Sequence, residues 1–147
     1  MISMRKSPLS GKRIEQMTKV VLDTNVVVSA FLSPAGKPGT ILRLVLRGDF
    51  DLCMNTAILA EYEKVLCLPK FIGPIHLKAI QRFIDILHEI GTDVICSPSS
   101  IGMPDESDRK FYDVAIAAEA ILVTGNKKHY PNESFIMNPS EFLTLQG

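Results

Sequence analysis

The chain has 147 residues, of which 46% are apolar, and its 16 basic and 16 acidic side chains cancel to a formal net charge of zero. These values indicate one globular domain and argue against a disordered chain or one drawn to nucleic acid by bulk charge. No apolar stretch reaches the roughly 20 residues of a membrane span, and the N-terminus lacks the apolar core of a secretion signal, so we expect a cytoplasmic protein. The odd, widely spaced Cys53, Cys67 and Cys96 are typical of reduced, packed thiols.

Residues 1–18 are polar and basic and are expected to form an N-terminal extension, a candidate flexible segment, ahead of a folded domain over residues 19–147. In that domain short buried strands alternate with helices. The run KVVLD has no polar alternation, which indicates a strand buried on both faces. The expected strands cover residues 19–23, 50–54, 93–97, 121–125 and 134–138, and the expected helices cover 25–32, 40–48, 57–68, 75–90, 108–120 and 139–145.

Capping and breaking residues set several of these boundaries. Gly48 is expected to stop the second helix, and Asn55 with Thr56 is expected to cap the third. The alternation of strands and helices implies right-handed crossovers. The sequence therefore predicts an α/β fold, a three-layer α/β/α sandwich with a central, mostly parallel sheet.

Polar residues follow two of the expected strands. Asp23 ends the first strand, and Thr124, Gly125 and Asn126 end or follow the strand over 121–125. In an open parallel sheet the ligand crevice lies beyond the carboxyl ends of the strands, so these residues are expected to face one crevice. Taken alone, Asp23 could equally be an ordinary helix N-cap.

Other acids are candidates for the same crevice. Glu61 lies near the edge of the apolar stripe of its helix, where a solvated glutamate is the alternative, while Glu63 points farther round the helix. Asp105 and Asp108 fall at or before a helix start, where an acid can serve as a cap. Asp113 lies among apolar neighbours, and burying an unpaired carboxylate there would cost several kcal/mol, so a positive group is expected nearby.

Carboxylates that converge from separate segments favour a hard divalent cation such as Mg²⁺, which prefers oxygen ligands and keeps several waters. The three histidines, His76, His88 and His129, have no tight metal-ligand spacing. His76 and His88 are expected at the surface or in helix packing.

Three segments in this order resemble the PIN domain family: VVLDTNVVVSAFL, ILAEYEKVL and DRKFYDVAIAAEAILVTGNKKHYP. They look like the branch of bacterial toxin components of toxin–antitoxin systems, and the late PSEFL adds to the likeness. The resemblance covers roughly residues 19 to 145 and is carried by the ordered set of motifs. It implies a parallel sheet between helices and a metal-dependent ribonuclease site built from acids.

The resemblance also assigns roles to residues. It implies that Asp23, Glu61 and Asp113 are catalytic, and that these three with Asp108 hold Mg²⁺ or Mn²⁺. The position after VTG is often aspartate in the family but is Asn126 here, which weakens a two-ion site more than a one-ion site. Thr124, Asn25 and Asn126 are expected to support the site.

The implied reaction is hydrolysis of RNA phosphodiester bonds by a water that the metal positions and activates. The RNA backbone must then be bound by local cations, of which Lys127 and Lys128, directly after a strand end, are the leading candidates. Lys37, Arg43 and Arg47 around the second helix are further candidates, although each of these side chains could simply be solvated. A cognate antitoxin protein and a second copy of the chain are expected partners, and a membrane is not.

Two other classes stay open at this point. A phosphatase with an aspartyl nucleophile also places an acid after the first strand, but it usually has a second aspartate two residues later, where this chain has Asn25. A PIN-fold binding module with weakened catalysis is the other alternative, and Asn126 is the feature that favours it. Stabilisation of the fold by Mg²⁺ or Mn²⁺ would separate an enzyme from such a module.

Overall fold

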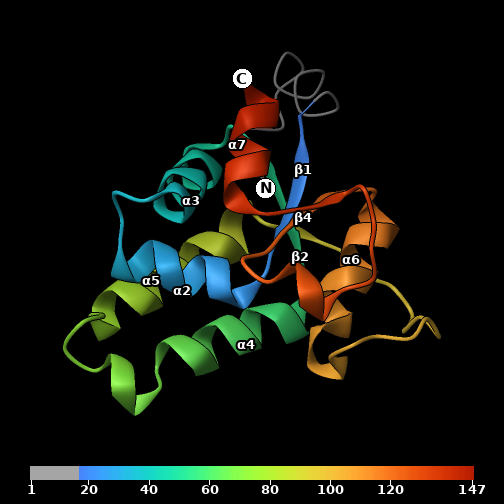
Figure 1. Cartoon of the computed structure of the whole chain (residues 1–147). Helices are drawn as coiled ribbons and strands as arrows, with labels where there is room; N and C mark the ends of the chain where they lie inside the picture. Colours follow the sequence, from blue (N-terminus) through green and yellow to red (C-terminus); the bar gives the residue numbers. More distant parts are fainter. Residues whose placement is uncertain (1–16) are drawn as a thin grey trace.

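The computed structural model describes residues 17–147 and folds them around a five-stranded sheet (Figure 1). The expected N-terminal extension lies almost entirely outside the described residues. The strands are β1 (Lys19–Leu22), β2 (Asp51–Met54), β3 (Thr92–Asp93), β4 (Ile121–Val123) and β5 (Ile136–Met137). The α-helices are α2 (Thr24–Leu32), α3 (Lys37–Arg47), α4 (Thr56–Leu66), α5 (Leu77–Ile90), α6 (Arg109–Ala118) and α7 (Pro139–Gln146). Short 3-10 turns are η2 (Pro69–Phe71), η3 (Glu106–Asp108) and η4 (Lys127–His129).

All neighbouring strands pair in parallel, in the order β3-β2-β1-β4-β5. The chain runs outward from β1 through β2 to β3 and then returns to the other side of β1 for β4 and β5. The direction in which the chain adds strands thus reverses between β1 and β4. Open α/β sheets form their ligand crevice at this switch point. Helix α6 packs on β1, β2 and β4, and Figure 1 shows α2, α3 and α5 on the other side. The predicted three-layer α/β/α sandwich is confirmed.

Most predicted ends lie within two residues of the observed ones, and the two largest differences have identifiable reasons. Helix α3 begins at Lys37, three residues earlier than expected, because Gly36 is its N-cap and a proline lies in its first turn, where a missing N–H costs nothing. The third strand was expected over 93–97 but ends at Asp93. The Val94 N–H donates to the Met54 carbonyl at 2.8 Å, and the chain then leaves this sheet edge, so that Ile95 is 92% exposed.

The core joins both faces of the sheet to the helices. Val20, Val21 and Leu22 are fully buried, as the continuous apolar run predicted. In α4 the buried side chains are Ile58, Leu59, Tyr62 and Leu66, which confirms most of the predicted stripe. The Asn55 side chain caps this helix by accepting from the Ile58 N–H at 2.9 Å, also as predicted.

Tyr62 ties α4 to the end of the central strand. Its ring packs against Phe83 of α5 and Phe111 of α6, and its hydroxyl donates to the carbonyl of Leu22. Because Asp23 follows Leu22 directly, this contact fixes α4 beside the first acid of the chain. The fold therefore places Glu61, one residue before Tyr62, at the carboxyl ends of the strands.

All three cysteines are free, in agreement with the sequence. Cys53 is buried, but Cys67 is exposed, so the expectation of a packed thiol is wrong at that position. Within the described residues no helix combines the length and apolarity needed to cross a bilayer.

Candidate active site

Asp23 is buried at the end of β1, and its carboxylate is not used as a helix cap. Its position is the N-cap of α2, yet the side chain makes no capping hydrogen bond. Instead its Oδ2 accepts from the Thr124 hydroxyl at 2.8 Å and from the Tyr130 hydroxyl at 2.9 Å. Because the β1 and β4 ends are adjacent, Thr124 reaches Asp23 across a separation of 101 residues. The sheet itself therefore aims this carboxylate into the crevice.

Glu61 of α4 joins the same group. Its Oε2 accepts from the Thr24 hydroxyl, and its Oε1 pairs with the Lys110 ammonium at 2.6 Å. The side chain is one-quarter exposed, whereas Glu63 is fully on the solvent side. Three elements, α2, α4 and α6, thus meet at Glu61.

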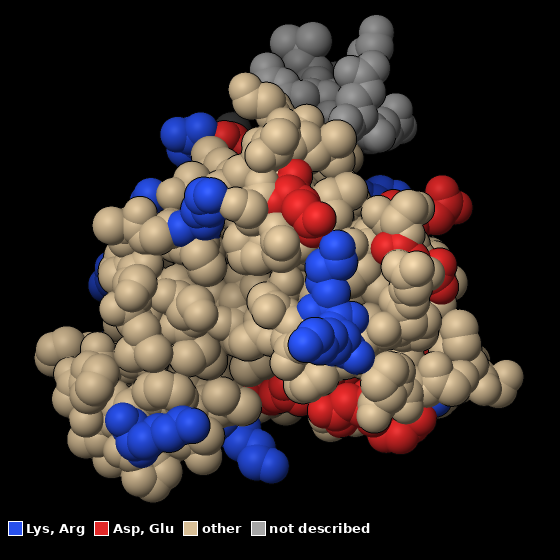
Figure 2. All heavy atoms as spheres, viewed as in Figure 1, with Lys and Arg blue, Asp and Glu red and all other residues tan. Residues whose placement is uncertain are grey.

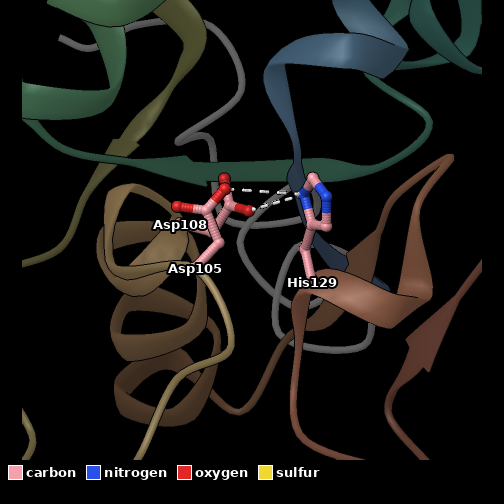
Figure 3. A group of neighbouring side chains, drawn as sticks. All are labelled: Asp105, Asp108 and His129. Atoms are coloured by element: carbon pink, nitrogen blue, oxygen red, sulfur yellow. Dashed lines mark hydrogen bonds and ion pairs between the residues drawn. The ribbon is translucent and has the colours of Figure 1, made fainter.

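Asp108 precedes α6 and faces the turn after β4. The Asp108 Oδ2 lies 3.1 Å from His129 Nδ1, and Asp105 Oδ2 lies 3.8 Å from the same nitrogen. Figure 3 shows His129 projecting from that turn toward both aspartates. One ligand atom from each of the three residues lies within 4.8 Å of the others. The Asp108 carboxylate, like that of Asp23, makes no capping hydrogen bond to its helix.

The ionisation of the acids shows that they share one electrostatic environment. Burial raises the pKa of Asp23 above its ordinary value; the hydrogen bonds from Thr124 and Tyr130 oppose this rise, and the charge of Glu61 adds to it. Burial, followed by the charges of Asp23 and Asp105, raises the pKa of Asp108 to about 6. Carboxylates that disfavour one another's ionisation in this way are a mark of functional sites.

Tyr130 is held in its neutral, donating form. Burial and the charge of Asp23 raise the pKa of this phenol far above its ordinary value. It can therefore only donate to Asp23 at physiological pH, which fixes the orientation of that carboxylate.

Asp113 lies elsewhere, although the sequence placed it with the other acids. It is buried, but its Oδ2 accepts from the backbone N–H of Ser99 at 3.0 Å, and its Oδ1 has no hydrogen-bond partner. Arg109, whose pKa is raised in part by Asp113, also binds the Ser99 carbonyl at 2.8 Å. The acids whose charges act on Asp23 and Asp108 are Glu61, Asp23 and Asp105, and Asp113 is not among them.

The expected supporting residues are found around the strand ends. Asn25 is exposed; its Oδ1 accepts from the Gly125 N–H at 2.9 Å, and its Nδ2 lies 3.4 Å from Asp23 Oδ2. The Thr124 hydroxyl also accepts from the Asn126 N–H at 3.0 Å. The Asn126 amide lies 2.9 Å from His129 Nε2. These contacts tie the loop after β4 to the first turn of α2.

Basic side chains border the acids. Lys127 and Lys128 are both exposed; Lys127 pairs with Glu141 at 3.1 Å, and no acid among the described residues pairs with Lys128. Figure 2 shows basic side chains gathered at the centre of the viewed face, directly above a row of acidic ones at its lower edge. The cations around α3 are held in local contacts: Lys37 with Ser140, Arg43 with Pro34 and Arg47 with Asp49.

The chemistry of the donor set fits a divalent cation. Asp23, Glu61 and Asp108 supply carboxylate oxygens, which Mg²⁺ and Mn²⁺ prefer. Lys110 neutralises Glu61, but within residues 17–147 neither Asp23 nor Asp108 has a lysine or arginine partner. Two buried carboxylates in that situation are stabilised by a bound cation. The residues present therefore fit the metal that the sequence led us to expect.

Three residues of this site were not assigned to it from the sequence, namely Lys110, His129 and Tyr130, and Asp105 was considered only as an acid at a helix start. His129 and Tyr130 lie in the polar segment NKKHYP, which follows the end of β4 after Thr124 and Gly125, and this position was the signal that could have identified them. Lys110 lies two residues from Asp108 and is recognisable only once α4 and α6 are known to meet.

The fold and the acids at its switch point define a doubly wound α/β domain with a candidate site for a hard metal ion. The family model of the PIN domain matches residues 19–128, and the chain belongs to that family. PIN domains are generally nucleases.

Two further comparisons agree with this membership. An uncharacterized protein of Methanocaldococcus jannaschii is 36% identical over 112 residues, which span 74% of this chain and 71% of that protein. The crystal structure of VapBC2 from Rickettsia felis, bound to a DNA fragment from its promoter, has a chain that is similar in fold, with a TM-score of 0.53. The identity there is 21%, and the match covers 82% of this chain and 98% of the other.

Proposed function

We propose that this chain is a metal-dependent endoribonuclease that hydrolyses RNA phosphodiester bonds. The observation that supports this most is the convergence of Asp23, Glu61 and Asp108, from three distant segments, at the switch point of a PIN-family sheet. These three acids are proposed to hold one Mg²⁺ or Mn²⁺ ion. Bound there, the ion would supply charge stabilisation for phosphoryl oxygens and lower the pKa of a water.

The chain's own residues prepare this site. Thr124 and Tyr130 hold the Asp23 carboxylate in one orientation, and Thr24 and Lys110 hold Glu61. Asn25 and Asn126 are proposed to support the crevice through the loop contacts described above. A carboxylate oxygen of the cluster that does not bind the ion is available to accept a proton from water.

Asp113, expected in this set from the sequence, is proposed to have a different role. Its hydrogen bond from the Ser99 N–H, together with the hydrogen bonds from Arg109 to the carbonyls of Ser99 and Ile101, joins α6 to the loop over residues 96–101. We infer that it positions this loop, and that Asp108, which was also expected in the metal site, holds the ion without it.

The substrate is proposed to be RNA bound along the rim of the crevice. Lys127 and Lys128 begin the turn η4, which carries His129 and follows β4 after Thr124, Gly125 and Asn126, so a phosphate backbone held by them would pass close to the acids. We further propose a cytoplasmic toxin of a toxin–antitoxin pair, with an antitoxin protein and a second copy of the chain as partners. The motif resemblance and the fold shared with a chain of VapBC2 support this assignment.

The test is a cleavage assay on defined single-stranded and structured RNAs with Mg²⁺, Mn²⁺ or EDTA. We expect cleavage with metal, none with EDTA, and a loss of at least about a thousandfold in Asp23→Asn, because the central metal-holding carboxylate is removed. The variant should remain folded and slightly more stable without metal, since repulsion among the acids is relieved. Wild-type cleavage by the purified, folded variant would contradict the assignment, and metal binding without cleavage would favour a binding module.

A further inference from the structure

Both ring nitrogens of His129 have polar partners: Nδ1 faces the acids Asp108 and Asp105, and Nε2 faces Asn126. The Nδ1 atom lies 3.1 Å from Asp108 Oδ2 and 3.8 Å from Asp105 Oδ2, and Nε2 lies 2.9 Å from the Asn126 amide. The ring is partly buried, with 43% of the side chain exposed. Figure 3 shows the ring aimed at the two aspartates. A solvated histidine would not need partners on both sides.

The backbone holds this ring in place. His129 ends the 3-10 turn η4, which Asn126 precedes, and the His129 N–H donates to the Asn126 carbonyl at 3.1 Å. The same turn is linked to β4 because the Asn126 N–H donates to Thr124, which itself donates to Asp23. The position of the imidazole is therefore coupled to the end of β4 and to the first acid of the site.

The Asn126 side-chain amide can hydrogen-bond to either tautomer of the neutral imidazole, because it has both a donor and an acceptor. As placed, its Nδ2 donates to Nε2, so Nδ1 carries the proton and donates to Asp108. If the amide turns over, its Oδ1 accepts from a protonated Nε2, and the lone pair of Nδ1 then faces Asp108 and Asp105. A metal-bound histidine is usually held in this way, by a second group that accepts from its other nitrogen.

We propose that His129 Nδ1 is a ligand of the divalent ion, with Asp108 and Asp105 as its neighbouring oxygen donors and Asn126 as the group that orients the ring. This inference rests on the proposed function, since it concerns the same ion. It explains why an asparagine stands after VTG: the position orients a nitrogen ligand instead of supplying an oxygen ligand. A site of mixed nitrogen and oxygen donors binds first-row transition ions better than an all-oxygen site does, and gains little for Mg²⁺.

The experiment uses the full chain with Mn²⁺ alone and no RNA. Pulsed electron paramagnetic resonance detects the nuclear modulation of a directly bound nitrogen, and the signal of free Mn²⁺ gives the affinity. We expect nitrogen modulation in the wild-type protein, and we expect its loss in His129→Gln. The same substitution should weaken Mn²⁺ binding about tenfold or more while it changes Mg²⁺ affinity less than about threefold.

His88→Gln is the matched control, because His88 is exposed on α5 and contacts none of the acids. It should keep both the modulation and the affinity. Mn²⁺ binding without nitrogen modulation in the wild-type protein would overturn this inference and leave the nuclease proposal standing. The absence of any Mn²⁺ or Mg²⁺ binding would overturn both.

A second variant tests the role of Asn126. Asn126→Asp accepts from Nε2–H permanently and should raise Mn²⁺ affinity severalfold when His129 is present. In the His129→Gln background this gain should largely disappear, because the ring that it orients is missing. A gain of equal size in both backgrounds would assign the effect to the added charge and overturn the orienting role.

Discussion

Asp108 and Asp113 are five residues apart and are both buried, yet their carboxylates lie in opposite surroundings. Asp108 faces a histidine and the negative charges of Asp23 and Asp105, and its pKa rises to about 6. Asp113 faces a backbone N–H and the region of Arg109, and it belongs to a network that holds a loop. Burial alone therefore does not distinguish an acid proposed to bind metal from one proposed to hold a loop.

The difference lies in what completes each environment. The protein supplies part of the environment of Asp113: Oδ2 has a backbone donor and a guanidinium acts on the carboxylate, although Oδ1 has no hydrogen-bond partner. Around Asp108 the protein supplies more negative charge than positive, and an additional cation is needed to balance it. An acidic cluster with more negative than positive charge favours binding of a cation, and this is the electrostatic property expected of a metal site.

The comparison is tested most strongly by Asp108→Asn and Asp113→Asn. We expect Asp108→Asn to lower kcat/KM for metal-dependent RNA cleavage by about a hundredfold or more, because it removes a metal-holding carboxylate. Asp113→Asn should change kcat/KM by less than about threefold and lower the free energy of unfolding by about 1 kcal/mol, through weaker contacts with the loop. Cleavage kinetics and urea denaturation measure the two quantities. The reverse ranking would return Asp113 to the site.

The same contrast applies within α4. Glu61 contacts Thr24 and Lys110 at the strand ends, while Glu63 is exposed. Glu61→Gln is therefore expected to lower kcat/KM at least about tenfold, and Glu63→Gln is expected to leave it unchanged. If Glu63→Gln were the more damaging variant in the same assay, the acids of α4 would act through a different surface from the one described.

The fold was predictable because its signals are local and repeated. The buried run before Asp23, the stripe around Tyr62 and the Asn55 cap each specify one element, and alternation of elements then specifies the parallel sheet. The third strand was placed poorly because Ile95 and its neighbours look like a strand, but at the sheet edge only one partner strand is present. Edge pairing depends on tertiary contacts that the local pattern does not carry.

The site was predictable only in part. Asp23 and Thr124 followed from the rule that strand ends meet at one edge of the sheet. Asp108 and Asp113 were both expected to hold the metal because the PIN resemblance assigns both positions, and nothing in the sequence alone separates them. Their partners in the structure separate them, because His129 and Asp105 face Asp108 whereas the Ser99 N–H donates to Asp113. His129 was overlooked because its partners are distant in sequence.

The raised pKa of Asp108 makes the stability of the metal-free protein depend on pH. The pKa of Asp108 is about 6 in the folded protein and 3.8 in its ordinary state, so between about pH 4 and pH 6 the folded state binds more protons than the unfolded state. The contribution of Asp108 to stability therefore falls as pH rises through this window and is constant above it. Asp108→Asn should match the wild type near pH 4 and be more stable by about 1 kcal/mol at pH 7, after allowance for screening by water.

Urea denaturation in EDTA at both pH values measures this difference. The Asp113→Asn variant is the control and should not show a stabilisation that appears only at the higher pH. An Asp108→Asn variant that is less stable than the wild type at pH 7 without metal would mean that the carboxylate is already compensated by the protein. The contrast with Asp113 would then fail.

The smallest expected effect concerns the rim of the site, where Lys128 is exposed without an acidic partner among the described residues and Lys127 is paired with Glu141. If RNA approaches the acids along this rim, Lys128→Gln should weaken RNA binding about two- to fivefold at moderate salt and reduce the dependence of log affinity on log salt by about 0.7, the value for one phosphate of a single strand. Binding is measured by fluorescence anisotropy with labelled RNA and catalytically inactive Asp23→Asn as the background. Lys78→Gln, an exposed lysine on α5, is the matched control and should change neither quantity. Equal losses from both variants would indicate that RNA affinity depends only on the overall charge of the protein. Lys128 would then not form a specific RNA-binding rim beside the acids.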